Sequence, residues 1–314
     1  MTQAEEAGRG RPGTAVALVV AALLFPVLNW LPLFAAALAV LLVLLPPRRP
    51  LAATAGALGL AAVGMGLRTP ELLDSATLAW SLVVAVAFGA ATLLRPGWGF
   101  FARALAAVAA GLAGVGGWLA ASGSWARVDA GVHGWLRAAV DTWLTGLRAQ
   151  SGTSSMLGMF EPVLRATGEL WWTVFPAIVC IQSLVALALA WWLFARFAPH
   201  GGRWAQLRPL REFRFNDHLI WVAIAGLVLV LLPHGLGLSR IGGNALFLMG
   251  GLYIVRGLGV LLFTTGVTPV VLSVVLGIFA FLPISQLVLA VALLVGLGDT
   301  WLDVRRRAAL TPRA

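Results

Sequence analysis

The chain contains 314 residues, of which 60% are hydrophobic and only 11% are charged. That balance excludes a soluble globular domain and predicts an all-α polytopic membrane protein, built as a single integral membrane domain over residues 1–314. The formal net charge of +10 comes from arginines that lie mostly in short loops between apolar runs. The charge therefore predicts membrane orientation and argues against nucleic acid as a partner.

The sequence contains no lysine, and its single cysteine, Cys180, lies inside an apolar run. Without lysine, neither a Walker-type phosphate loop nor a lysine Schiff-base enzyme can reside on this chain. One cysteine excludes an intrachain disulfide and a thiolate metal cluster. The sequence also lacks a His-Glu-x-x-His or Gly-x-Ser-x-Gly motif and paired acids within the apolar runs. We therefore expect no enzyme activity, no metal and no cofactor.

Apolar runs of spanning or nearly spanning length follow one another along the chain. Residues 1–13 are polar, and we expect them on the cytoplasmic side, ahead of an uncleaved first span. The expected helices are 14–29, 31–46, 51–67, 77–94, 103–121, 170–194, 219–233, 244–264 and the region 268–297. Pro283 lies near the middle of the last region, which is therefore one kinked helix or two short ones.

Basic segments predict how these spans are oriented. They lie at residues 48–49, 95–103, 196–214 and 303–314. The first three fall on the same side as the N-terminus when the spans alternate, which fits the excess of arginine in cytoplasmic loops. The tail 303–314 joins them only if 268–297 crosses twice. We therefore favour about ten spans, with nine as the alternative, in a bacterial cytoplasmic membrane with a cytoplasmic N-terminus.

The stretch at about 125–168 is the longest piece outside the apolar runs, and its first part is amphipathic. One face is rich in Val, Leu and Trp. A charged row at four-residue spacing occupies another face: Asp129, His133, Arg137 and Asp141. The pattern predicts an extracytoplasmic helix that lies on the membrane surface or on the protein, with the charged row in solvent. A lid over a membrane cavity is the functional alternative.

Arg256 is the one charged side chain well inside a long apolar run. An arginine near the bilayer centre costs roughly 2.5–3.5 kcal/mol on insertion scales, so something must offset that cost. Either the side chain reaches back to lipid phosphate, or it faces a polar cavity and binds a ligand. Tyr253, three residues earlier, and Asn244 lie on the same expected helix. These three residues are the candidate ligand-binding site.

A second candidate surface is the basic loop before the span 219–233. Arg208, Arg211 and Arg214 lie there, close to the expected membrane surface. Such a cluster binds anionic lipid headgroups, or it docks a partner on the cytoplasmic side. In the segment that follows, Asn216 or Asp217 is expected to cap the next helix.

The second half of the chain carries motifs that resemble a known family. They are Phe215-Asn216-Asp217-His218-Leu219-Ile220-Trp221, Asn244-Ala245-Leu246, Tyr253-Ile254-Val255-Arg256-Gly257 and Gly296-Leu297-Gly298-Asp299-Thr300-Trp301-Leu302-Asp303. In order and spacing they resemble the YybS-like family of bacterial multi-pass membrane proteins, a family of unknown function. The resemblance covers most of the chain, and it implies a helical membrane fold without implying an activity.

The YybS-like family is in turn similar in character to the substrate-binding subunits of energy-coupling-factor transporters. Those subunits dock a membrane partner through small residues spaced by four on the first span. Ala17 and Ala21 match that spacing here, so the resemblance implies a candidate partner-binding face at these two residues.

Two functions of different classes remain after these steps. The first is a substrate-binding or transport component for a small solute, with an anion as one option because of Arg256. The second is a non-catalytic scaffold or assembly factor that binds other membrane proteins. The expected partners are membrane lipids and membrane transport or envelope proteins, and the oligomeric state is left open.

Overall fold

The computed structural model describes residues 31–44, 71–151, 154–197, 210–232, 236–267 and 283–303, together with Arg305 and Arg307. Within these ranges the secondary structure is helical, and no strand occurs. The expected all-α class is therefore confirmed for the described part of the chain. The expected spans 14–29 and 51–67, the tail from 308 and the residues 268–282 lie outside it.

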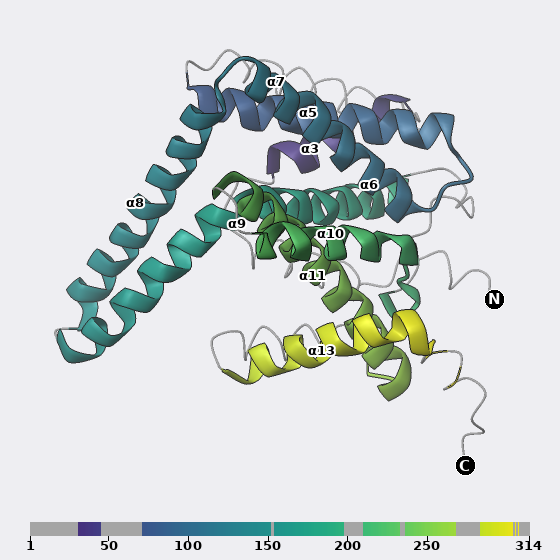
Figure 1. The fold of residues 1–314 in the computed structure, drawn as a ribbon. Helices are drawn as coiled ribbons and strands as arrows, with labels where there is room; N and C mark the ends of the chain where they lie inside the picture. The colour runs from purple at the N-terminus through teal and green to yellow at the C-terminus, as the bar shows by residue number, and fades with distance from the viewer. Residues whose placement is uncertain are drawn as a thin grey trace.

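The α-helices follow one another in this order: α3 (Leu31–Leu44), α5 (Leu72–Leu94), α6 (Phe100–Gly111), α7 (Gly117–Ala121), α8 (Trp125–Ser151), α9 (Ser154–Phe197), α10 (Ile220–Leu231), α11 (Leu236–Thr265) and α13 (Pro283–Leu302). A π-helical turn, η1 (Leu112–Gly116), joins α6 to α7 without a break. Two 3-10 turns, η3 (Leu210–Glu212) and η4 (Asp217–Leu219), precede α10. The apolar helices form one bundle, from which α8 and the first part of α9 project as an antiparallel hairpin (Figure 1).

This hairpin is the structural form of the stretch expected at about 125–168. Its first helix, α8, contains 27 residues, and α9 continues for 44 residues from the hairpin into the bundle. The end of the stretch expected at about 125–168 and the span expected at 170–194 are thus one helix. The turn residues 152–153 lie outside the described ranges.

Four helical segments within the described ranges are long and apolar enough to cross a membrane. They are Leu72–Leu94, Phe100–Ala121, Glu161–Ala195 and Gly237–Thr265. Three shorter apolar segments accompany them: Leu31–Leu44, Asp217–Leu231 and Leu287–Leu302. Helix α10, with 12 residues, is only about 18 Å long against a hydrocarbon core of about 30 Å. The expected count of ten spans is therefore not supported.

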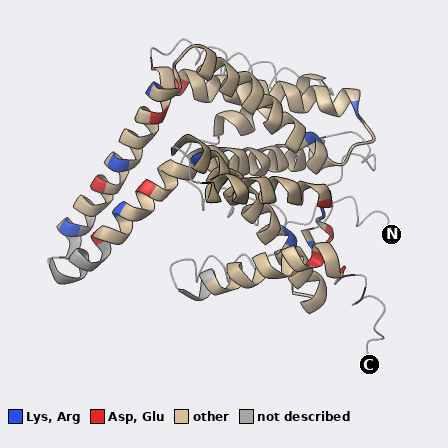
Figure 2. Ribbon diagram, in the orientation of Figure 1, with Lys and Arg blue, Asp and Glu red and all other residues tan. Residues whose placement is uncertain are grey.

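Charged residues gather mainly at two ends of the molecule and are sparse along the helices between them (Figure 2). One group lies on the hairpin and beside its base; we call this the hairpin end. The other lies where α10 begins and α13 ends, and it includes Arg214, Arg256, Asp299 and Arg305. We call this second group the basic end.

Helix α11 packs closely against both α10 and α13 through paired glycines. A Cβ atom built on Gly226 of α10 would lie 3.0 Å from the carbonyl oxygen of Gly242 in α11. Farther along α11, a Cβ on Gly257 would overlap the carbonyl oxygen of Ala292, and a Cβ on Gly296 would overlap that of Tyr253. Close backbone approach through small residues is the usual way in which membrane helices associate.

Candidate functional site

The first cluster centres on Arg256, whose side chain is only 3% exposed. Its Nε donates to Oδ2 of Asp299 in α13 at 3.0 Å, and its Nη1 donates to Oδ1 of Asp217 in η4 at 2.6 Å. Its Nη2 donates to the main-chain carbonyl of Asp299 at 3.3 Å, and its guanidinium carbon lies 5.4 Å from the ring centroid of Phe215. The Arg256 side chain is therefore held by protein carboxylates, rather than reaching freely to lipid phosphate or lining an open cavity.

The two carboxylates differ in how far they are withdrawn from solvent. The Asp299 side chain is fully buried, whereas the Asp217 side chain is 59% exposed. The Oδ1 atom of Asp299 has no hydrogen-bond partner among the described residues. Because burying an unpaired carboxylate is far more costly than burying an ion pair, Asp299 depends on Arg256 for compensation.

Arg305 adds a second buried guanidinium to the basic end. Its Nη2 lies 4.0 Å from Asp299 Oδ2 and donates to the carbonyls of Phe213, at 2.9 Å, and Arg256, at 3.1 Å. Its Nη1 donates to the carbonyl of Arg211 at 3.1 Å. Burial lowers the pKa of Arg305, and attraction to Asp299 opposes that change. These bonds tie the start of the tail to the segment before α10 and to α11.

The expected partner-binding arginines are placed differently from one another. Arg214 donates to Oδ1 of Asp303 at 2.5 Å, so it joins the basic end as an ion pair. The Arg211 side chain is 51% exposed. Arg208, like Ala17 and Ala21, lies outside the described residues.

Tyr253 lies one turn before Arg256 and is 2% exposed. Its ring packs edge-on against Phe215, with 5.2 Å between the ring centroids. Its hydroxyl is buried and faces the hydroxyl of Thr300 in α13. The structure therefore brings Tyr253 and Arg256 together around Phe215.

Asn244 belongs to a second cluster, because it lies 12 residues before Arg256, or about 18 Å along the helix. The Asn244 side chain bonds to the backbone of α9 next to Pro176. Its Oδ1 accepts from the Ala177 N–H at 2.9 Å, and its Nδ2 donates to the Thr173 carbonyl at 2.9 Å. A proline inside a helix disturbs the hydrogen bonds of the preceding turn, and in membranes a neighbouring helix is one source of partners for the freed groups.

Arg240, one turn before Asn244 in α11, also donates hydrogen bonds to the backbone of α9 before Pro176. Its Nη2 donates to the Trp172 carbonyl at 2.9 Å and to Asp129 Oδ1 of α8 at 2.6 Å. Its Nε donates to the Thr173 carbonyl at 3.2 Å, and its guanidinium carbon lies 4.7 Å from the centroid of the Trp172 ring. Arg240 therefore joins three helices, α8, α9 and α11, at the base of the hairpin.

We predict that Asn244→Leu will lower the free energy of unfolding by about 1–3 kcal/mol, because it strips buried backbone groups of their partner. Pro176→Ala provides the matched background. There, Ala177 can return its N–H to the Thr173 carbonyl, so the cost of Asn244→Leu should shrink. The four proteins form a double-mutant cycle, read by chemical unfolding in detergent. Equal costs in both backgrounds would show that Asn244 does not compensate for Pro176.

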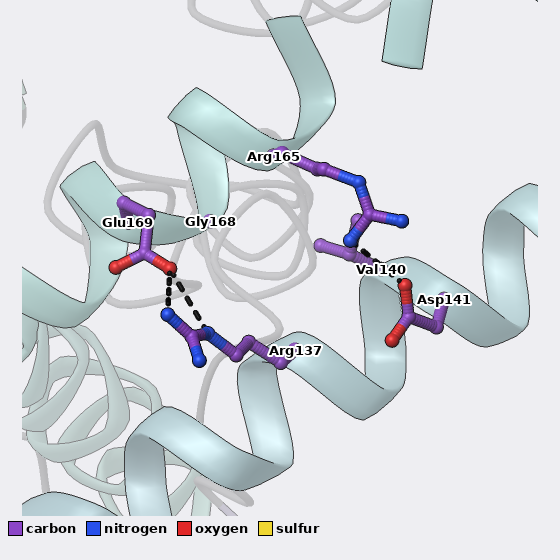
Figure 3. A pocket seen from close by; sticks show the side chains of 6 residues that line it. All are labelled: Arg137, Val140, Asp141, Arg165, Gly168 and Glu169. Atoms are coloured by element: carbon purple, nitrogen blue, oxygen red, sulfur yellow. Dashed lines mark hydrogen bonds and ion pairs between the residues drawn. The ribbon is translucent and has the colours of Figure 1, made fainter. Parts of the chain in front are cut away.

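The charged row of α8 pairs with α9 instead of facing solvent alone. His133 Nε2 lies 2.9 Å from Glu169 Oε2, and the His133 ring stacks on Trp172 with 4.2 Å between centroids. Arg137 bonds to the same Glu169, and Arg165 of α9 lies 3.0 Å from Asp141 (Figure 3). The charged row thus lies along the seam between α8 and α9, and the expected exposure to solvent holds for Arg137 and Asp141, whose side chains are 63% and 56% exposed.

A third feature is an apolar groove between α3, α5, η1, α7, α8 and α9, near the base of the hairpin. Its walls are mainly aliphatic and aromatic, with Trp80, Trp125 and Phe175 among them. None of the described residues that line it is charged. Its polar lining consists of Thr77, Ser81, Gln182 and Ser183.

The polar lining of the groove lies where α5 faces α9. The indole Nε1 of Trp80 donates to Oγ of Ser183 at 2.9 Å, which fixes one wall against the other. Ser81 is 1% exposed and Gln182 is 5% exposed. On the π-helical side, a Cβ built on Gly116 would meet no atom within 4 Å, so this glycine leaves the groove open. Single π-helical turns are frequent at functional sites.

The described part of the chain contains no group of three or more His, Cys, Asp or Glu side chains that could hold a metal ion. Its long apolar helices, with charges gathered at the ends, define a polytopic helical membrane protein. The family described as "Predicted membrane protein (DUF2232)" matches residues 14–300, and the chain belongs to this family. Comparison with curated proteins and with solved structures gives no match.

Proposed function

We propose that this protein is a non-enzymatic membrane component that binds a small, neutral and mainly apolar molecule as the substrate-binding part of a transport system. The apolar groove at the hairpin base carries this proposal. Binding sites for small molecules are mostly lined by apolar and aromatic side chains, with a few placed polar groups. The groove has this composition, and the hydroxyls of Thr77, Ser81 and Ser183 donate to carbonyls of their own helices, so they can offer a ligand only acceptor oxygens.

The chemistry of the groove favours a neutral ligand over the anionic solute that Arg256 first suggested. A charged ligand would lose its hydration without a counter-charge among the described lining residues, which is strongly unfavourable. Arg256 itself already donates to Asp217 and to Asp299. We therefore assign Arg256 and Tyr253 to the packing of the basic end, and Asn244 to the backbone groups of α9 beside Pro176.

The resemblance to substrate-binding subunits of energy-coupling-factor transporters supports the transport reading. We place the protein in the bacterial cytoplasmic membrane, with the basic end and the N-terminus on the cytoplasmic side, because arginine-rich segments favour that side. The groove then opens in the outer half of the membrane, where a substrate-binding component would receive its ligand. The scaffold alternative rests on the exposed side chain of Arg211, and it predicts a bound partner protein in place of a small ligand.

The test is whether filling the groove removes a bound molecule. Gly116→Leu places a side chain into the groove, whereas Gly117→Leu adds the same side chain at the next residue, which does not line the groove. We expect native mass spectrometry of gently solubilised wild-type protein, purified from its own membranes, to show a small bound molecule. That molecule should be retained by Gly117→Leu and lost from Gly116→Leu.

Thermal unfolding in detergent serves as the control, because both leucine variants should stay folded and monodisperse. A bound molecule that survives Gly116→Leu would place the ligand elsewhere and contradict the proposal. A wild-type protein that carries a reproducible partner protein and no small molecule would favour the scaffold function.

A further inference from the structure

The hairpin of α8 and α9 has two different faces. In α8, His133 and Arg137 directly follow the buried Val132 and Leu136, and they lie on the face that pairs with Glu169 of α9. In the hairpin portion of α9, Glu161 and Arg165 continue this charged face, pairing with Arg148 and Asp141 of α8. A residue one position before a buried residue therefore lies on the opposite face of the hairpin from a residue one position after it.

The opposite face carries large apolar side chains that are exposed. Trp135 and Trp143 directly precede the buried Leu136 and Leu144 in α8, and they are 45% and 57% exposed. In α9, Val163 and Leu170 occupy the equivalent flank and are 60% and 55% exposed. Because the helices are antiparallel, the flanks before the two packed rows meet on one side of the hairpin. We call Trp135, Trp143, Val163 and Leu170 the tryptophan face.

We propose that the tryptophan face lies on the bilayer surface at the hairpin end of the membrane, with its tryptophans at the level of the lipid headgroups. A contiguous exposed apolar face of this kind marks an interaction site. Tryptophan is favoured at membrane interfaces, because its ring is apolar and its N–H can bond to water or headgroups. Amphipathic helices with such a face lie in the interface plane.

Continuity with α9 selects the bilayer as the occupant. This helix runs from the hairpin into the apolar segment Glu161–Ala195 without a break, so the hairpin is tethered at the membrane surface. Leu170 belongs to the tryptophan face and lies within that same segment. The face is therefore an extension of the lipid-facing surface of α9. The charged face of the hairpin is paired within the protein. The tryptophan face is therefore the one for which transfer from water to the bilayer surface is favourable.

The experiment compares two positions on either side of the buried Leu144. In a Cys180→Ala background, Trp143→Cys reports on the tryptophan face and Thr145→Cys reports on the charged face. Each cysteine carries an environment-sensitive nitrobenzoxadiazole label, and the full chain is reconstituted in nanodiscs of phosphatidylcholine and phosphatidylglycerol. A nitroxide on the lipid acyl chain near the headgroup quenches labels that lie at the interface.

We expect blue-shifted emission and several-fold stronger quenching for the label at 143 than for the label at 145. A Trp135→Cys label, two turns earlier, should behave like the label at 143, which guards against a local effect of one substitution. Equal quenching at 143 and 145, or quenching at neither, would overturn the proposal. Shielding of position 143 that appears only in native membranes would identify a protein partner on this face and would also overturn it.

Discussion

Replacing Arg256 with alanine will destabilise the helix bundle by about 3–5 kcal/mol, since removing one partner of a buried ion pair leaves the other charge uncompensated. The carboxylate left behind is that of Asp299, whose side chain is fully buried. Arg305 lies 4.0 Å from it and bonds chiefly to backbone carbonyls, so it replaces Arg256 only in part. Chemical unfolding of the purified protein in detergent measures the loss.

Two further variants separate the ion pair from other roles of Arg256. Arg211→Ala removes a half-exposed arginine from the same end, where a surface pair contributes at most about 1 kcal/mol. The double variant Arg256→Leu with Asp299→Leu removes both charges, and it should be much more stable than Arg256→Ala, because apolar replacement of a buried pair is often neutral. An Arg256→Ala protein as stable as the wild type would contradict the assigned role.

The sequence identified Arg256 as unusual but not the groups that neutralise it. Asp299 stands at the end of the last apolar run, where it looks like a surface residue, and Asp217 looks like a helix cap. In the structure Asn216 makes the cap, since its Oδ1 accepts from the His218 N–H at 3.0 Å. Asp217 is thereby left to pair with Arg256. Only the packing of α10 and α13 on α11 brings these carboxylates together.

The hairpin shows a similar division between local and tertiary information. Periodicity predicted an amphipathic helix at the start of the stretch 125–168, and α8 is that helix. The expectation that its charged row faces solvent holds for Arg137 and Asp141, but it does not include the pairing of the row with α9. One signal was present: Glu161, Arg165 and Glu169 repeat at four-residue spacing, with charges that complement those of α8. Two such rows on helices joined by a short turn can face each other in an antiparallel hairpin.

The second cluster and the groove depend on features that a single sequence shows only indirectly. Pro176 inside an apolar run signals that freed backbone groups need other partners, which a neighbouring helix can supply. Arg240 and Asn244, spaced by four in α11, supply polar groups to α9. From the sequence alone, Asn244 is grouped with Arg256 because both lie on the same expected helix. The groove arises where η1 departs from α-helical geometry, and the sequence shows there only a glycine-rich stretch.

Gly257→Ala and Gly296→Ala will each destabilise the protein by about 3 kcal/mol or more, since the added methyl meets main chain that cannot rotate away. The obstructing atoms are the carbonyl oxygens of Ala292 and Tyr253, so α11 and α13 must separate. Gly250→Ala on the same α11 is the matched control. A Cβ there meets no atom within 4 Å, and alanine should stabilise the helix by roughly 0.5–1 kcal/mol.

The two glycines also hold the ion pair, because Gly257 directly follows Arg256, and Gly296 lies one turn before Asp299. Separation of α11 from α13 would therefore lengthen the bond from Arg256 to Asp299. Once Gly257→Ala has weakened that bond, Arg256→Ala has less left to remove, so the two changes should cost less together than the sum of their separate costs. Unfolding of the double variant measures this coupling. Strict additivity would mean that the ion pair forms independently of the glycine contact.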